Sequence, residues 1–447
     1  MGIDATREEL MKWWINGLLG VGFAVAAMQA SAQNEQYIPV LSYRVGPYAA
    51  GGSGYFGGAI DYWTLVNLNG GINGVKIIWE ECETEYNASR GVECYERLKT
   101  RHGGASTVDP LSTGIAYGLF ERVAQDKIPM TTNGYGLAIS ADGAVFPWVF
   151  PLGTTYWDQA AAMVAYLGQK AGGEAKLKGK KIAFMYHDSA YGKEPIPVFD
   201  ALAARDGFEL TKIPITPPGT TQESQWLQIR QLRPDYVILW GYGVMNPVAL
   251  KTAAKLGYPR DKILGVWWAG SEEDVIPAGD AAKGYVTAAF SAYGTNFPVM
   301  QEIEKKVYGA GKGNLEDKSR VGSIYHTRGV TYGIMIVEAF RQAQNHFGKG
   351  KVMTPEQVRW GLEHLDLSEA RLKELGAAGL FPPVKTSCMD HEGSGMVKFQ
   401  QWDGKEFKTL TPFMAGDRAL VHKMVLEGAA KYAAEKKITP RDCSKEM

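Results

Sequence analysis

The stretch Lys181-Ile-Ala-Phe-Met-Tyr-His187 is an apolar run as long as a buried strand, and it opens the most regular part of this sequence. Predicted helices alternate with further apolar strands after it. They are a helix from about Gly192, a strand at Phe208–Ile213, a helix at Gln222–Leu232, a strand at Tyr236–Trp240, a helix to Leu256 and a strand at Ile263–Trp268. This order predicts an α/β fold, with a mostly parallel sheet flanked by helices.

The same rhythm occurs once before this stretch. Its elements are a strand at Tyr37–Tyr43, a helix at Tyr55–Leu68, a strand at Val75–Trp79, a helix at Ala88–Thr100 and short strands at Ile128–Thr132 and Trp148–Phe150. Two such sets predict two lobes. We expect an N-terminal lobe of residues 37–151 and 286–396, and a C-terminal lobe of residues 152–285 and 397–447 that includes a C-terminal extension.

Length and composition narrow the classes of protein that fit. The chain has 447 residues, which is long for one domain and comfortable for two. Hydrophobic residues make up 45% and charged residues 21%, as in ordinary globular proteins. The formal net charge is zero, whereas a nucleic-acid-binding protein would show a basic excess. We therefore expect no nucleic-acid partner.

The N-terminus has the features of a secretory leader. A short apolar segment precedes Ala30-Ser31-Ala32, a small-x-small site of the kind that signal peptidase cleaves. This pattern predicts a signal peptide over residues 1–32, a mature chain that begins at Gln33, and a periplasmic location; a retained anchor helix is the alternative. The start is either Met1 or Met11, and Met11 gives the more typical leader because it omits an acidic stretch.

Four cysteines occur in two widely separated pairs. Spacing along the chain favours the disulfides Cys82–Cys94 and Cys388–Cys443, and an exported chain meets an oxidising compartment in which such bonds persist. Four free buried thiols are the alternative. Neither pair has the C-x-x-C spacing of zinc or thioredoxin-like sites, so we expect no metal.

Motifs of catalysis and of cofactor binding are weak or absent. Gly52-Ser-Gly-Tyr-Phe-Gly57 matches G-x-G-x-x-G, but eight residues separate it from the end of the first strand at Tyr43. The dinucleotide-binding motif begins directly at that turn, so we interpret the glycines as a flexible loop that opens a helix. No P-loop, H-E-x-x-H or G-x-S-x-G sequence is present. We predict no cofactor and no enzymatic activity.

Aromatic side chains gather where the predicted strands end. Ligands in open α/β sheets lie beyond the carboxyl ends of the strands, and aromatic rings there can stack on a planar or apolar ligand. The alternative for each ring is simple packing between the lobes. One cation stands in this set, and its planar guanidinium suits a carboxylate, with a salt bridge between surface groups as the alternative. The residues are Arg44, Tyr48, Trp240, Tyr242, Trp267 and Trp268.

Several segments together resemble the periplasmic binding proteins of branched-chain amino-acid-type ABC transporters. The resemblance covers almost all of residues 37–403 and rests on order and spacing. Its segments are Gly46-Pro47, Leu68-Asn-Gly-Gly-Ile-Asn-Gly74, Tyr186-His-Asp-Ser-Ala-Tyr-Gly192 and Met353-Thr-Pro-Glu-Gln-Val358. It implies the type I periplasmic binding protein fold, in which two lobes joined by three hinge crossovers close over a ligand.

The resemblance also implies positions for the ligand site. In such proteins hydroxyls and backbone amides after the third and fourth strands hold the ligand, and two tyrosines of the second lobe complete the site. Those positions match Ser112, Thr113, Asn133, Tyr135, Tyr191 and Tyr242. The family's ammonium-binding acid falls at Trp267 or Trp268, unless Glu272 or Glu273 takes its place. The departure favours an aromatic carboxylate over an amino acid, because a buried ammonium without an acidic partner is costly.

These observations predict a periplasmic solute-binding protein that captures a small organic ligand and delivers it to the membrane permease subunits of an ABC importer. An aromatic carboxylate is the expected ligand, and a branched-chain amino acid or a small amide is the alternative. A ligand-sensing protein of the same fold is the second alternative, and a secreted hydrolase the third.

Overall fold

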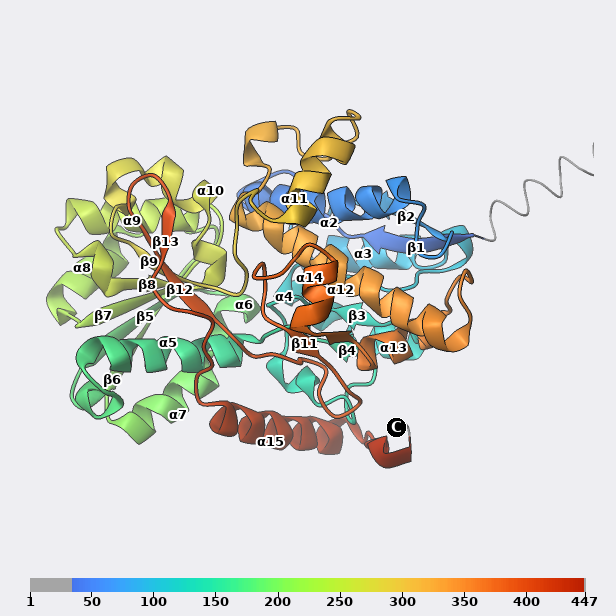
Figure 1. Ribbon diagram of the computed structural model, residues 1–447. Helices are drawn as coiled ribbons and strands as arrows, with labels where there is room; N and C mark the ends of the chain where they lie inside the picture. Colours follow the sequence, from blue (N-terminus) through green and yellow to red (C-terminus); the bar gives the residue numbers. More distant parts are fainter. Residues whose placement is uncertain (1–33, 446–447) are drawn as a thin grey trace, which may run out of the picture.

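Two lobes lie side by side in the protein, whose computed structural model describes residues 34–445 (Figure 1). The blue, cyan and orange segments form most of one lobe, and the green and yellow segments form most of the other. The predicted leader lies outside the described residues. Within residues 34–445, no helix has the length and apolar character that crossing a membrane requires.

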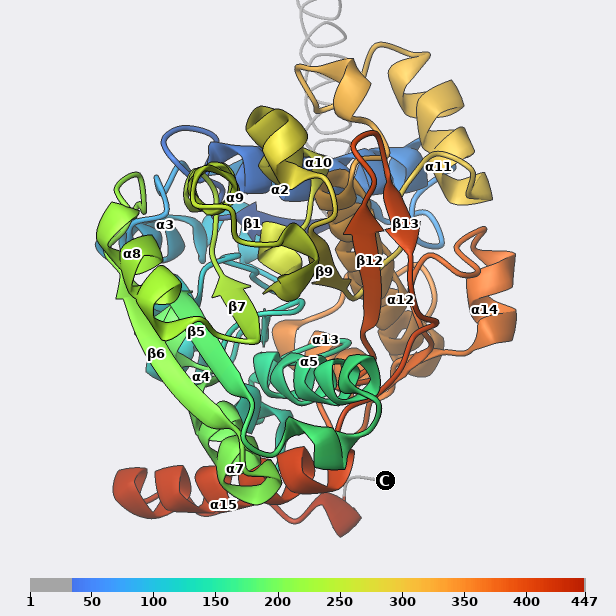
Figure 2. The same cartoon turned by 90° about the vertical axis from the view of Figure 1, so that its left-hand side faces the viewer.

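The C-terminal lobe contains a seven-stranded sheet of order β13-β12-β9-β8-β7-β5-β6. Its strands are β5 (Lys181–His187), β6 (Glu209–Ile215), β7 (Tyr236–Trp240), β8 (Ile263–Gly265), β9 (Val286–Ala289), β12 (Lys398–Trp402) and β13 (Phe407–Thr409). Strands β5 to β9 pair in parallel, and β12 pairs antiparallel with both β9 and β13. Figure 2 views this lobe from outside, with α8 and β6 at one edge of the sheet.

Helices cover both faces of this sheet, which explains why its strands are continuous apolar runs. Alternate residues of a strand point to opposite faces. Ile182 and Phe184 of β5 pack in one apolar core, and Ala183 and Met185 pack in a second one. The helices are α5 (Tyr156–Ala171), α6 (Ala190–Lys193), α7 (Ile196–Asp206), α8 (Glu223–Leu232), α9 (Met245–Lys255) and α10 (Glu272–Val275). The predicted α/β class and the mostly parallel sheet are confirmed.

The N-terminal lobe has a second parallel arrangement. Strands β1 (Glu35–Val40) and β2 (Lys76–Glu81) pair in parallel, as do β3 (Met130–Thr131) and β4 (Val149–Phe150), and single bridges through residues 108–109 connect the two pairs. The helices of this lobe are α2 (Ala49–Leu68), α3 (Ala88–Leu98), α4 (Thr113–Asp126), α11 (Pro298–Glu302), α12 (Ile324–Phe347), α13 (Pro355–Glu363) and α14 (Glu369–Glu374). Strand β10 (Asp366–Leu367) follows α13, and strand β11 (Val384–Lys385) follows α14. The two short strands pair antiparallel.

The chain passes between the lobes three times, as the resemblance implied: between β4 and α5, between β9 and α11, and between β11 and β12. After the third crossover the chain forms the β12–β13 hairpin. It then ends in the long helix α15 (Arg418–Lys436) and a short tail.

The glycine motif at residues 52–57 lies inside helix α2, which corrects the expectation of a flexible loop before a helix at Tyr55. Its role is close packing of α2 against α12. A Cβ added at Gly54 would lie 2.5 Å from the Cβ of Tyr325, and one added at Gly329 would overlap the carbonyl oxygen of Tyr55. Only glycine permits so close a backbone approach, so Gly54 packs α2 against α12, whereas Gly52 and Gly57 make room for Tyr43 and Leu315.

Both predicted disulfides are present. Cys82–Cys94 joins the chain after β2 to helix α3, and Cys388–Cys443 ties the C-terminal tail to the chain before the third crossover. The described residues contain no free cysteine. They also contain no group of three or more His, Cys, Asp or Glu side chains that could hold a metal ion.

The α2–α12 contact predicts the effect of a single methyl group. We expect Gly329→Ala to lower the free energy of unfolding by about 1–3 kcal/mol, because the new Cβ forces two backbones apart. Gly118→Ala is the matched control: Gly118 is exposed on α4, and its added Cβ would meet only a Val92 methyl group at 3.1 Å. Urea titration of both variants measures the difference, and equal stability of the two would contradict this packing role.

The disulfides predict unequal losses of stability. They close segments of 12 and 55 residues. By the chain-entropy model, Cys82→Ser/Cys94→Ser costs about 3 kcal/mol and Cys388→Ser/Cys443→Ser about 4 kcal/mol. Unfolding in guanidinium chloride without reductant measures both. A larger loss for the shorter segment would show that local packing, and not loop closure, sets their contributions.

Candidate ligand-binding site between the lobes

A small cavity of about 10 Å³ lies between the two lobes. That volume is close to the room that one water molecule needs, so the lobes are tightly closed around it. Side chains of both lobes line it: Tyr43, Tyr86, Leu111, Ser112, Thr113 and Tyr135 from the N-terminal lobe, and Tyr156, Tyr191, Tyr242 and Trp268 from the C-terminal lobe. None of these side chains is charged.

The structure brings part of the predicted site together at this cavity. The predicted residues that line it are Ser112, Thr113, Tyr135, Tyr191, Tyr242 and Trp268. The predicted residues that do not line it are Arg44, Tyr48, Asn133, Trp240 and Trp267. Sequence reasoning did not name Tyr86 or Tyr156, and Tyr43, at the end of the first strand, was not among the predicted ligand-binding residues.

Helix α4 begins at the wall of the cavity. Ser112 is its N-cap, and the Ser112 hydroxyl accepts a hydrogen bond from the N–H of Ile115 at 3.4 Å. The first N–H groups of a helix have no partner within the helix, and the helix dipole makes this end electropositive. Ser112 and Thr113 line the cavity, so the uncharged site has one end that favours an anionic group.

Leu111 precedes this helix in a left-handed conformation, with φ of 40°. Its carbonyl oxygen accepts a hydrogen bond from the Tyr43 hydroxyl at 3.1 Å, and its N–H donates to the Tyr135 hydroxyl at 2.7 Å. A non-glycine residue in this conformation costs free energy, and these two hydrogen bonds help to hold it there. The turn fixes two aromatic walls of the cavity relative to helix α4.

Most tyrosine hydroxyls of the cavity donate their proton in a hydrogen bond to another protein group. A hydroxyl has one proton, and that of Tyr43 goes to a carbonyl, so Tyr242 donates in the 2.5 Å contact between Tyr43 and Tyr242. Tyr135 donates to Asp109, and Tyr191 donates to the carbonyl of Gly241 at 2.9 Å. These four residues therefore present mainly their rings to a ligand.

Asp109 is a buried acid behind Tyr135, and sequence reasoning missed it. It accepts hydrogen bonds from the Tyr135 hydroxyl, from the Tyr55 hydroxyl at 2.9 Å and from the N–H of Leu111 at 2.8 Å. Burial raises its pKa to about 7. Asp109 does not line the cavity and orients Tyr135 from behind. The sequence itself shows only that Asp109 follows the apolar residue Val108.

Further aromatic rings support the cavity from the C-terminal lobe. Trp267 stacks on Tyr156 with ring centroids 5.7 Å apart, and Trp240 packs against Tyr156 at 5.4 Å. The N–H groups of the Trp267 and Trp268 indoles both donate to the carbonyl of Gly134, at 2.9 and 3.1 Å. Gly134 belongs to the N-terminal lobe, so the two tryptophans hold the lobes together. Trp267 follows the end of β8 in a short turn and not in the predicted strand.

Tyr48 joins the lobes at another edge of the cavity. Its ring stacks on Tyr242 with centroids 5.4 Å apart, and its hydroxyl lies 2.7 Å from Nε2 of His187. Burial lowers the pKa of His187 to about 4, so the imidazole is neutral at pH 7 and can accept this hydrogen bond. Gly51 allows the approach of Tyr242, because a Cβ at Gly51 would overlap the Tyr242 hydroxyl.

The cation that sequence reasoning placed near the ligand lies outside the cavity lining. The Arg44 guanidinium donates to Glu81 at 3.0 Å and to Asn314 at 2.8 Å, and about a quarter of its side chain is exposed. A different cation, Arg328, is fully buried behind Trp268, with its guanidinium carbon 5.0 Å from the Trp268 ring centroid. Burial lowers the pKa of Arg328 to about 10, so it stays charged.

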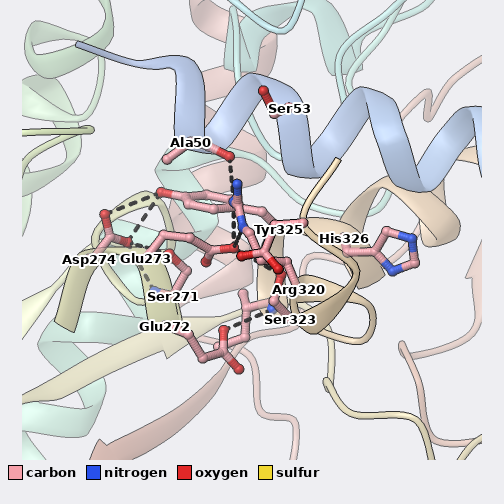
Figure 3. Close-up of polar contacts among 12 residues, drawn as sticks. Ala50, Ser53, Ser271, Glu272, Glu273, Asp274, Arg320, Ser323, Tyr325 and His326 are labelled. Carbon is pink, nitrogen blue, oxygen red and sulfur yellow. Dashed lines mark hydrogen bonds and ion pairs between the residues drawn. The ribbon is translucent and has the colours of Figure 1, made fainter. Parts of the chain in front are cut away.

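Glu272 and Glu273, which follow β8, contact the N-terminal lobe and not the cavity (Figure 3). Glu272 accepts a hydrogen bond at 2.9 Å from the N–H of Ile324, the first residue of α12. Glu273 accepts hydrogen bonds from Arg320 at 2.7 Å and from Ser323 at 3.0 Å. Both carboxylates therefore have partners in the other lobe and are occupied in holding the lobes together.

Comparisons with known proteins place this geometry in a family. The chain matches the family model described as periplasmic binding protein over residues 35–406. A structure from the Pseudomonas fluorescens group, described as an ABC transporter permease, is 45% identical, with 92% of this chain and 99% of that chain covered and a TM-score of 0.85. No curated protein matches the chain.

Two more distant structures share the fold. A branched-chain amino acid ABC transporter protein from Thermus thermophilus with bound valine is 20% identical, with 88% of this chain and 99% of that chain covered and a TM-score of 0.73. A solute-binding protein of R. palustris in complex with benzoate is 19% identical, with 86% and 98% covered and a TM-score of 0.67. With the match over most of its length, this chain belongs to the periplasmic binding protein family, whose members are the solute-binding proteins of ABC transporters.

Proposed function

We propose that this protein captures a small aromatic carboxylate between its lobes and delivers it to the permease subunits of an ABC importer. The observation that carries the proposal is the cavity itself, whose aromatic walls meet the N-terminal end of helix α4 and whose lining includes no charged side chain. Rings can stack on a flat ligand, and the N–H groups at the helix end can donate hydrogen bonds to a carboxylate. The benzoate complex of the R. palustris protein supports this class of ligand for the fold.

A branched-chain amino acid fits the cavity less well. Its ammonium group would need an acidic partner in a buried site. Glu272 and Glu273 are engaged by the N-terminal lobe, and Asp109 by two tyrosines and the N–H of Leu111. A branched-chain amino acid remains the second candidate, because the Thermus thermophilus protein of the same fold has bound valine.

Capture requires the lobes to open and close. The cavity of about 10 Å³ is smaller than a benzoate ion, so we infer that the lobes separate for entry and close again around the ligand. The closed state gains contacts from both lobes, and a ligand that bridges them favours it. The permease subunits then receive the closed form. Export through the predicted leader, with cleavage before Gln33, places this exchange in the periplasm.

Glu194 shows that closure has an electrostatic cost. Its Oε1 accepts a hydrogen bond from the N–H of Ala138 in the other lobe at 2.8 Å, and its Oε2 is buried without a hydrogen-bond partner in the described residues. Burial raises the pKa of this carboxyl to about 8. The protonated form therefore suits the closed interface better than the carboxylate does.

One prediction of the proposed function concerns how the carboxylate is bound. Thr113→Val keeps the shape of the side chain and removes its hydroxyl, so we expect it to weaken benzoate by about 1.5–3 kcal/mol and to affect benzyl alcohol less. Arg44→Ala is the comparison, because Arg44 was the cation expected from sequence and it lies outside the cavity lining. Calorimetry with benzoate, cinnamate, leucine and valine measures both variants.

Three outcomes of this experiment are decisive. Tight binding of benzoate or cinnamate with a selective loss in Thr113→Val supports the proposal. A larger loss of affinity in Arg44→Ala would show that Arg44 binds the carboxylate. Binding of leucine or valine alone would show that the ligand is an amino acid and not an aromatic carboxylate.

The raised pKa of Glu194 leads to a prediction about the pH dependence of stability. Because the pKa of Glu194 is raised in the folded state, its contribution to stability is greatest below the unfolded value near 4.5 and is lost as pH rises toward 8. Each pH unit in this window removes at most about 1.4 kcal/mol. We expect the unfolding free energy of Glu194→Gln to fall less between pH 5 and pH 8 than that of the wild type.

Glu209→Gln is the control for this measurement, because Glu209 is exposed on β6. Chemical unfolding at pH 5 and pH 8 gives the two slopes. If the wild type and Glu194→Gln show the same change with pH, Glu194 is ionised in the folded protein and the assignment fails.

A further inference from the structure

The C-terminal helix α15 touches both lobes. In Figure 1 it runs along the lower edge of the molecule, from beneath α7 of the C-terminal lobe to the chain end beside the N-terminal lobe. It contacts α5 of the C-terminal lobe and the short turn Ala138–Ala141 of the N-terminal lobe. The proposed function assigns no role to this helix.

The start of α15 is anchored to the C-terminal lobe and the hinge. Asp417 forms an ion pair with Arg205 of α7. Arg418 donates to Asp158 of α5 at 2.6 Å and to Glu392, next to the third crossover, at 2.8 Å. The backbone carbonyl of Glu392 in turn accepts a hydrogen bond from Gly153 of the first crossover at 2.8 Å. The helix therefore begins where two of the crossovers meet.

The middle of α15 lies across the boundary between the lobes. Its buried residues follow one another at intervals of four and form one stripe along the helix: Val421, Val425, Ala429 and Ala433. At Gly428 the helix comes close to both lobes. A Cβ added there would lie 2.5 Å from Ile139 of the N-terminal lobe and 3.8 Å from Trp157 of the C-terminal lobe.

The end of α15 is anchored to the N-terminal lobe. Lys436 forms an ion pair with Glu121 of α4 at 2.6 Å. Arg441 donates its backbone N–H to the carbonyl of Ala144 at 3.0 Å. The disulfide Cys388–Cys443 then fixes the tail covalently to the chain before the third crossover.

We infer that α15 is a strap across the hinge that holds the two lobes in the closed arrangement. A hydrogen-bonded helix has a fixed rise per residue and does not stretch, so a relative rotation of the lobes has to detach it from one of them. The disulfide prevents release at the N-terminal lobe. Opening therefore detaches the start of the helix, at Asp417 and Arg418, and these contacts shift the equilibrium toward the closed state.

The test uses the ligand-free full chain with both disulfides intact, so its outcome does not depend on the identity of the ligand. Asp417→Asn/Arg418→Gln removes the contacts of the C-terminal lobe end. Lys423→Ala/Glu427→Ala is the matched control, because these residues form an exposed pair on the outer side of the same helix. The reporter is the N–H of Val244, which donates to the carbonyl of Pro47 across the lobes at 3.2 Å.

Hydrogen exchange of a peptide that contains Val244 should accelerate about fivefold or more in Asp417→Asn/Arg418→Gln, with a larger radius of gyration in solution scattering, and should be unchanged in the control. The result that overturns the inference is faster exchange within α15 itself with wild-type exchange at Val244 and an unchanged radius of gyration. Should the double variant not fold, Arg205→Gln removes the exposed ion pair with Asp417, together with the pair that Arg205 forms with the adjacent Asp206. A smaller change in the same direction supports the strap, and wild-type behaviour overturns it.

Discussion

The electropositive N-terminal end of helix α4 is the constraint on which the rest of the site depends. Buried backbone donors need acceptors, and here the helix begins at the wall of a small cavity between two lobes. The surrounding tyrosines do not compete strongly for those donors, because several of their hydroxyls are engaged with one another or with protein groups. What remains is an aromatic enclosure with one electropositive end, and this combination selects the class of ligand.

Closure of the lobes follows from the same interface. Trp267 and Trp268 place two donors on the single carbonyl of Gly134, and Tyr242 reaches Tyr43 through the space that Gly51 leaves open. Polar contacts of Glu272 and Glu273 with the start of α12 add a second line of contact, and α15 crosses the hinge on another side. Binding and closure are therefore one process, since the residues that enclose the cavity also join the lobes.

The alternation of strands and helices was enough to predict the α/β class, and Ser112, Thr113 and Tyr191, which the resemblance implied as site residues, line the cavity. Local pattern could not predict what long-range contacts decide. Arg44 turns to Glu81, which lies 37 residues away, and Gly54 of α2 makes room for Tyr325 of α12, about 270 residues later. Asp109 and Arg328 are isolated ionisable residues in the sequence, and only the three-dimensional packing reveals their positions.

The most direct test of the proposed site is a crystal structure of the mature protein grown with benzoate. In the proposed site the carboxylate accepts hydrogen bonds from the first N–H groups of α4 and from the Thr113 hydroxyl, with the ring among Tyr191, Tyr242 and Trp268. A carboxylate paired with Arg44, or a cleft that takes up an amino acid with its ammonium on an acidic side chain and rejects benzoate, would contradict it.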